Sequence, residues 1–216
     1  MAQTKERFVI MVGGEMEPEE FLKSYISPDD YLICADSGAD WAYQLGFSPS
    51  AVVGDFDSVS DEAKAFFRDK GCLFIPYPAE KDWTDTEIAI DHALERGARE
   101  IVLTCALGGR VDHEIGNVYL LEKLAKGGVK SKIVSRMHTI FVIEGSAEFK
   151  VEEGRTVSLF ALTDEATGIT TEGLKYPLQN GKLIRGTSLG ISNELAADRA
   201  YVELKGGRLL AVQVRV

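Results

Sequence analysis

The first 130 or so residues alternate short apolar runs with amphipathic segments, and this alternation restricts the fold more than any other feature of the sequence. Short apolar strands separated by helices are typical of βαβ units around a parallel sheet. The runs that we expect to form strands are residues 8–12, 31–35, 51–53, 73–75 and 101–105. We therefore predict an α/β fold whose N-terminal domain, residues 1–130, is a doubly wound, mostly parallel sheet.

The second part of the chain, after about Arg136, has a different sequence pattern. Segments that alternate like strands are separated there by glycine pairs and turns. The expected strands are residues 140–143, 157–162, 201–204 and 209–214. Turn signals at Glu144-Gly145, Asn180-Gly181 and Gly206-Gly207 predict hairpins. We predict a C-terminal antiparallel β-sandwich domain over residues 137–216, with an edge or face available for pairing with a second subunit.

Charge and cysteine content exclude several classes of partner. The net charge of −10 argues against a nucleic acid or an anionic membrane, because both bind clustered Lys and Arg. The first apolar run is too short for a signal peptide or a membrane span. Cys34, Cys72 and Cys105 are scattered and odd in number, so we expect reduced thiols in a cytoplasmic protein.

Acidic residues follow three of the expected strands, at the sheet edge where α/β proteins bind ligands. Asp36 follows the strand at 31–35, Asp55 and Asp57 follow the strand at 51–53, and Asp85 follows the strand at 73–75 after a loop. If Asp55-Phe56-Asp57 is extended, both carboxylates face the same way. Two such carboxylates repel each other unless a cation is shared between them, which predicts a metal site.

A glycine pair after the strand at 101–105 predicts a phosphate site. Gly108 and Gly109 precede an expected helix, so their backbone N–H groups can face phosphate at its N-terminus. Arg110 adds a planar charge that suits phosphate. His113 and Asn117, four residues apart on one helix face, are placed to contact a nucleotide.

Purely structural roles also fit each of these residues. Asp55 and Asp57 fit a turn that closes the bend at Gly54, and Asp112 fits a helix N-cap. Thr84 and Glu87 form a capping box sequence, in which Glu87 reaches back to the N-cap. Two further segments have equally plain interpretations, a solvated charge run and a polar turn: Lys81 and Ser192-Asn193-Glu194.

Five motifs, in order along nearly the whole chain, carry a resemblance to one family. They are Ala35-Asp36-Ser37-Gly38-Ala39, Gly54-Asp55-Phe56-Asp57-Ser58, Lys81-Asp82-Trp83-Thr84-Asp85-Thr86-Glu87, Gly108-Gly109-Arg110-Val111-Asp112-His113 with Asn117, and Ser192-Asn193-Glu194. Together they resemble the thiamine pyrophosphokinase family. The resemblance implies transfer of the terminal diphosphate of ATP to the hydroxyl of thiamine, which gives thiamine diphosphate and AMP with magnesium.

The resemblance also implies roles for the motif residues. A catalytic group of three carboxylates would hold magnesium: Asp55, Asp57 and Asp85. ATP would contact a second set: Asp36, Ser37, Lys81, Arg110, Asp112, His113 and Asn117. Ser192 and Asn193 would bind thiamine from the β-domain of a partner subunit, because the family forms homodimers with active sites at the subunit interface.

The sequence departs from the family pattern in two places. Ser37 stands where many members have glycine. Some members bring an aromatic side chain from the β-domain onto the thiamine pyrimidine, but both tryptophans here, Trp41 and Trp83, lie in the first half. The group that holds this ring is therefore open. Two other functions stay open as well: a pyrophosphokinase for another heterocyclic alcohol such as a hydroxymethylpterin, and a non-catalytic sensor of MgATP.

Overall fold

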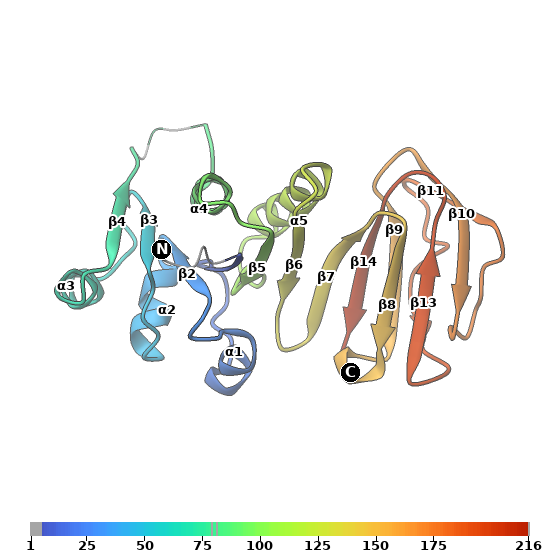
Figure 1. Cartoon of the computed structure of the whole chain (residues 1–216), viewed down its shortest axis with the longest axis horizontal. Coiled ribbons are helices and arrows are strands. Elements are labelled where there is room, and N and C mark those ends of the chain that lie inside the picture. The colour runs from blue at the N-terminus through green and yellow to red at the C-terminus, as the bar shows by residue number, and fades with distance from the viewer. Residues whose placement is uncertain (1–5, 79, 81, 216) are drawn as a thin grey trace. The chain divides into compact units, whose positions relative to one another are not determined.

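The computed structural model describes residues 6–78, 80 and 82–215. The chain divides into two compact units, Met1–Ser135 and Arg136–Val216 (Figure 1). Within the described residues, no helix is both long and apolar enough to span a membrane.

The first unit is a parallel sheet with helices on both faces (Figure 1). Its strands are β1 (Arg7–Met11), β2 (Tyr31–Ala35), β3 (Ala51–Gly54), β4 (Leu73–Pro76), β5 (Glu100–Thr104) and β6 (Lys130–Val134). Its helices are α1 (Glu19–Tyr25), α2 (Gly38–Gln44), α3 (Asp61–Asp69), α4 (Asp85–Glu95) and α5 (Val111–Lys126). The described strands lie in the order β6-β5-β1-β2-β3-β4, and each neighbouring pair is parallel.

This strand order reverses between β1 and β5, which makes the sheet doubly wound. From β1 to β4 the chain adds strands on one side, with α1, α2 and α3 on one face. It then crosses back to β5, so α4 and α5 cover the opposite face (Figure 1). The predicted fold class of this half is confirmed, and the reversal places a crevice at the carboxyl ends of β1 and β5.

Local sequence explains most of these elements. The central strands β1, β2 and β5 are buried on both faces, as expected for apolar runs in a parallel sheet. Ser60 begins α3 by accepting a hydrogen bond from the Ala63 backbone N–H. The prediction omitted β6, because its Lys-Ser-Lys start has little apolar character and only Ile133 and Val134 are buried.

The second unit consists of two antiparallel sheets around one core. One sheet has the order β12-β9-β14-β7 and the other β11-β10-β13-β8. The strands are β7 (His138–Ile143), β8 (Ser146–Lys150), β9 (Thr156–Ala161), β10 (Glu165–Glu172), β11 (Gly181–Ile184), β12 (Asn193–Glu194), β13 (Arg199–Glu203) and β14 (Leu209–Val214). Buried side chains of both sheets, including Leu159 and Val202, form a single cluster. The predicted antiparallel sandwich is confirmed.

Two of the three predicted hairpins are wrong. Gly145 joins β7 to β8, and Gly206-Gly207 joins β13 to β14, but in both cases the two strands belong to different sheets. Only β10 and β11, before and after Asn180, pair with each other. Turn residues predict that the chain reverses, whereas strand pairing depends on which face each strand buries.

Candidate functional site

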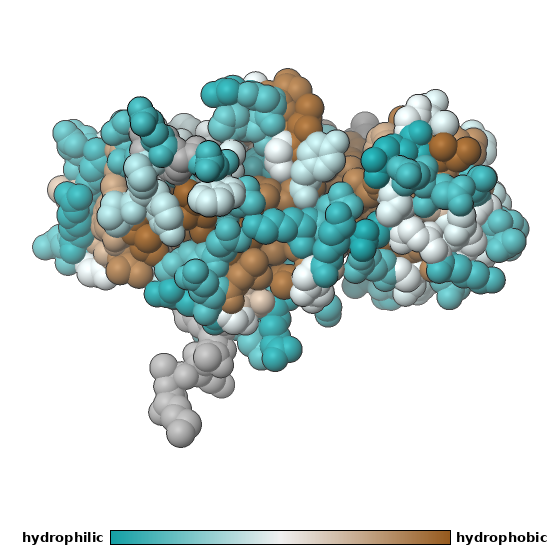
Figure 2. Space-filling view, turned by 90° about the horizontal axis from the view of Figure 1, so that it is seen from above, coloured by the Kyte–Doolittle hydropathy of each residue, from teal (hydrophilic) through white to brown (hydrophobic). Residues whose placement is uncertain are grey.

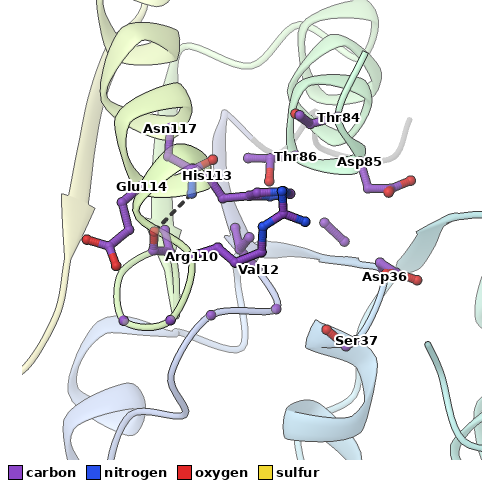
Figure 3. A pocket seen from close by; sticks show the side chains of 16 residues that line it. Val12, Asp36, Ser37, Thr84, Asp85, Thr86, Arg110, His113, Glu114 and Asn117 are labelled. Atoms are coloured by element: carbon purple, nitrogen blue, oxygen red, sulfur yellow. Dashed lines mark hydrogen bonds between the residues drawn. The ribbon is translucent and has the colours of Figure 1, made fainter. Parts of the chain in front are cut away.

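A cavity of about 360 Å³ lies at the point where the strand order of the first unit reverses (Figure 3). Its walls are the loops after β1, β2 and β5 and the first turns of α4 and α5. Figure 3 shows Asp36 and Asp85 on one side, and Arg110, His113 and Asn117 on the other. The cavity therefore has an acidic wall facing a wall that carries a guanidinium and an imidazole.

Glycine-rich loops bring backbone close to the cavity. The N–H of Gly14 donates to the Cys105 carbonyl at 2.8 Å, and a Cβ on Gly14 would lie 2.6 Å from that oxygen. The indole N–H of Trp41 donates to the Gly14 carbonyl at 3.2 Å. Gly108 has a φ of 78°, which favours glycine. These loops and the start of α5 form a concave lining of the kind that accepts phosphate groups.

Asp36 is the most constrained residue of the acidic wall. Its backbone is left-handed, with a φ of 48°, and its Oδ2 accepts a hydrogen bond from the Ser58 hydroxyl. Oδ1 is buried without a hydrogen-bond partner among the described residues. Burial raises the pKa of Asp36, the Ser58 hydrogen bond opposes this, and the nearby charges of Asp85 and Asp55 raise it again. The charged form is thus destabilised unless a cation is present.

The turn after β3 differs from the extended segment that we predicted. Phe56 has a φ of 63°, and its ring packs against Phe74 at a centroid distance of 5.4 Å. The Asp57 backbone N–H donates to Asp55 Oδ1 at 2.9 Å, so Asp55 closes the turn, as the structural alternative required. Asp57 is exposed, and neither residue lines the cavity. Because the backbone of Phe56 is left-handed, the segment lacks the extended conformation in which the carboxylates of Asp55 and Asp57 would face the same way.

The acidic wall fits a cation, although the described residues include no group of three or more His, Cys, Asp and Glu positioned as metal ligands. Asp85 lies beside Gly54, since its Oδ1 is 2.9 Å from where a Cβ on Gly54 would be. The charges of Asp85 and Asp55 act on Asp36, whose Oδ1 is buried without a hydrogen-bond partner among the described residues. Hard cations such as Mg²⁺ bind carboxylate oxygens of this kind.

Asp36→Asn should raise the stability of the metal-free protein at pH 7, by on the order of 1 kcal/mol, because it removes a half-buried charge from an acidic group. Asparagine tolerates the left-handed backbone, so the turn is retained. Thermal unfolding without divalent cations measures the change. Added Mg²⁺ should then raise the melting temperature of the wild type more than that of the variant. An equal rise in both would contradict the role of Asp36 in cation binding.

The opposite wall is organised by the start of α5. Arg110 donates to both carboxylate oxygens of Asp112, from Nε at 3.1 Å and from Nη2 at 2.5 Å. This hydrogen bonding lowers the pKa of Asp112 to about 2. Asp112 is not the N-cap of α5, because Arg110 occupies the N-cap position and the helix begins at Val111. Asn117 is buried, and its amide donates to the Ala106 carbonyl at 2.9 Å, which fixes the loop before the helix.

The other predicted ATP contacts have mixed outcomes. Ser37 lines the cavity at the start of α2, and His113 lines it from α5. Thr84 is confirmed as the N-cap of α4, accepting from the Glu87 backbone N–H at 3.2 Å. The prediction that the Glu87 side chain reaches back to the N-cap is wrong. Its carboxylate instead accepts a hydrogen bond from Lys123 at 2.9 Å. Lys81 lies outside the described residues.

The two predicted thiamine residues lie at the edge of the second unit. The N–H of Ser192, whose φ is 58°, donates to the Ser158 hydroxyl at 3.0 Å. The Asn193 amide bonds the backbone of Tyr176 twice, accepting from its N–H at 3.1 Å and donating to its carbonyl at 2.8 Å. The side-chain amide of Asn193 therefore fixes the position of the segment at Tyr176.

Tyr176 is the site candidate that sequence reasoning missed. Its side chain is 62% exposed, although its backbone is held by Asn193. The ammonium of Lys175 lies 5.5 Å from the ring centroid and pairs with Glu194 at 3.2 Å. An exposed aromatic ring on a fixed backbone is suited to stacking on a flat ligand. The available signal was an aromatic residue directly before a proline, in a segment without an apolar period.

Comparison with known proteins matches both units. The family model described as thiamin pyrophosphokinase, catalytic domain, matches residues 22–133, and that described as thiamin pyrophosphokinase, vitamin B1 binding domain, matches residues 138–209. Thiamine pyrophosphokinase of Bacillus subtilis is 30% identical over 206 residues, which cover 94% of this chain and 96% of the relative.

Solved structures of thiamine pyrophosphokinases share the fold of this chain. The structure of thiamine pyrophosphokinase from Bacillus subtilis aligns with a TM-score of 0.89 at 28% identity, covering 97% of this chain and 99% of that one. The structure of thiamin pyrophosphokinase from Geobacillus thermodenitrificans aligns with a TM-score of 0.85 at 33% identity, covering 97% and 98%.

Proposed function

This chain belongs to the thiamine pyrophosphokinase family, and from this premise we propose how its residues transfer a diphosphate from ATP to the hydroxyl of thiamine. The products of the reaction are thiamine diphosphate and AMP. The observation that carries the proposal is the cavity where the strand order reverses, with glycine loops and Arg110 facing Asp36 and Asp85. Such a cavity suits a chain of phosphates whose charge is offset by cations.

We propose that the glycine loops and Arg110 bind the phosphates of ATP, with Ser37, His113 and Asn117 around them. Magnesium would be held by Asp55, Asp57 and Asp85, beside Asp36, whose Oδ1 has no hydrogen-bond partner among the described residues and whose pKa the charges of Asp85 and Asp55 raise. When bound, the metal would offset charge on the phosphate oxygens. The chain itself orients the phosphates for in-line attack by the alcohol and stabilises the departing AMP through Arg110.

The thiamine end of the site belongs, in this proposal, to the second unit of a partner subunit in a homodimer. Tyr176 would stack on the pyrimidine ring, and Ser192 and Asn193 would border it. Exposed apolar side chains on α5, Val111 and Ile115, offer a surface near the cavity for this partner. A cytoplasmic location stays a prediction that the free thiols of Cys34, Cys72 and Cys105 support.

The acceptor is tested by measuring AMP release from MgATP with thiamine and, in parallel, with a hydroxymethylpterin. We expect release with thiamine alone, since the β-domain provides an exposed aromatic ring and the acidic wall favours a cationic thiazolium. Release with the pterin only would identify a different pyrophosphokinase. Binding of MgATP without AMP release on addition of either alcohol would support a nucleotide sensor.

A further inference from the structure

Helix α2 follows β2, the strand between β1 and β3 in the sheet, and its side chains bond to the loops after both of these neighbours. The start of the helix packs closely on the end of β1. A Cβ on Gly38 would clash with the Met11 carbonyl oxygen, and a Cβ on Gly13 would clash with Ser37 Oγ. The helix and the loop after β1 therefore cannot move past each other without a rearrangement of the backbone.

Trp41 connects α2 to the loop after β1. Its indole N–H donates to the Gly14 carbonyl at 3.2 Å. The same loop is joined to the loop after β5, because the N–H of Gly14 donates to the Cys105 carbonyl at 2.8 Å and the N–H of Glu15 donates to the Leu107 carbonyl at 2.9 Å. Both polar atoms of the peptide group between Gly14 and Glu15 are thus bonded. Trp41 therefore fixes the orientation of one part of the glycine-rich lining of the cavity.

Asp40 connects α2 to the segment after β3. Its Oδ1 accepts a hydrogen bond from the Ser60 hydroxyl, and the Ser60 backbone nitrogen lies 3.2 Å from each of its carboxylate oxygens. Ser60 also begins α3 as its N-cap. Two residues earlier, the Ser58 hydroxyl donates to Asp36. The chain that follows Asp57 is therefore held at two points by carboxylates at the start of α2.

The hydrophobic core anchors the helix that makes these contacts. Ala39 and Ala42 of α2 are fully buried, and Trp41 packs partly buried against the same cluster. Hydrophilic residues surround hydrophobic ones in the left part of Figure 2, where α2 and α3 lie in Figure 1. Because close-packed interiors yield little, a helix anchored in this way is a fixed support for the two loops that it bonds.

We propose that Trp41 and Asp40 are positioning residues, which hold the phosphate-binding loops and the turn of Asp55 and Asp57 at a set separation through one helix. Neither side chain lines the cavity, so each would act on a ligand only through the loop that it bonds. This inference rests on the proposed function, which assigns phosphates to one loop and magnesium to the other. Transfer depends on this separation, because a misplacement of about 1 Å can lower a rate about a hundredfold.

Trp41→Phe tests the contact with the phosphate-binding loops, because it removes the N–H donor and keeps an aromatic ring in the core. We expect the Kd for inorganic pyrophosphate, measured by calorimetric titration of the full chain without divalent cations, to rise about three- to tenfold, as the loss of one hydrogen bond would give. The Mg²⁺ concentration that gives half of the maximal rise in melting temperature should stay unchanged. Tyr43→Phe, at an exposed position of the same helix, is the matched control and should change neither value.

Asp40 variants should show the opposite pattern. Asp40→Ala removes the acceptors of Ser60, so the Mg²⁺ concentration for the half-maximal rise in melting temperature should increase about tenfold, and the Kd for pyrophosphate should change less than about twofold. Asp40→Asn keeps an oxygen acceptor and should respond to Mg²⁺ like the wild type. The asparagine variant thus separates a role in position from a role of the charge. If Asp40→Ala does not fold, Asp40→Leu, which is closer to aspartate in size, replaces it.

Four results would overturn the inference: unchanged pyrophosphate binding by Trp41→Phe, an unchanged Mg²⁺ response of Asp40→Ala, equal changes of both values in either variant, or equal weakening of the Mg²⁺ response by Asp40→Asn and Asp40→Ala. A wild type that binds neither Mg²⁺ nor pyrophosphate would contradict it as well. Thiamine-dependent AMP release by the wild type is measured separately. Its absence would contradict the proposed function, whereas the two binding measurements decide whether Trp41 and Asp40 position the loops.

Discussion

Asp85→Asn should lower kcat about 10²- to 10⁴-fold while the protein stays folded. Asp85 lines the cavity beside Gly54, and its charge is one of those that act on Asp36. Loss of metal-assisted charge stabilisation amounts to several kcal/mol, and each 1.4 kcal/mol or so is about a tenfold change in rate. Steady-state kinetics at saturating ATP, thiamine and Mg²⁺ measure the effect.

Asp61→Asn is the matched control for this variant. Asp61 is the first residue of α3 after the N-cap Ser60, as Asp85 is the first residue of α4 after the N-cap Thr84. Both substitutions remove a favourable interaction with a helix dipole, of about 0.3–1 kcal/mol. Only Asp85 lines the cavity, so only its variant should lose activity. Equal and small losses in both variants would show that Asp85 serves the helix alone.

Tyr176→Ala should raise the KM for thiamine about tenfold to a hundredfold and leave the KM for ATP nearly unchanged. Stacking of a heterocycle on an aromatic side chain contributes about 1–3 kcal/mol, which corresponds to this range. Tyr201→Ala is the control, because Tyr201 is another exposed tyrosine of the second unit and its hydroxyl donates to Glu148 at 2.9 Å. Initial rates over a range of thiamine concentrations separate the two constants.

Mixing the two variants tests whether two subunits share a site. In a mixed dimer, one site combines the intact Asp85 of one chain with the intact Tyr176 of the other. Random mixing should then restore about a quarter of wild-type activity at low thiamine concentration. If each chain forms its own complete site, the mixture will be no more active than the average of the separate variants.

The regular parts of the fold could be predicted because their signals are local. Strand β2 was predicted with its observed bounds, since a buried parallel strand is a continuous apolar run. Strand β6 was not, because only its last two residues are buried, and the sheet rather than the sequence makes it a strand. The hairpin errors have the same origin, because pairing partners far apart in sequence are chosen by burial in the folded unit.

The site was predictable as a set of segments but not as a geometry. Asp36, Asp85 and Asn117 do line one cavity, because their positions after strands and on a helix follow from the topology. The turn at Asp55 was misjudged because Phe56 adopts a left-handed conformation that bulky residues seldom adopt. Tyr176 was not predicted as a candidate because the fixed backbone below its exposed ring depends on Asn193, 17 residues later.

The most direct test of the central claim is a product analysis of the purified protein with MgATP and thiamine. We expect one thiamine diphosphate and one AMP for each ATP consumed, with no ADP, because the attack is on the β-phosphorus. Chromatographic quantification of all four compounds over the first turnovers gives this ratio. Formation of ADP together with thiamine monophosphate, or ATP hydrolysis that does not depend on thiamine, would contradict it.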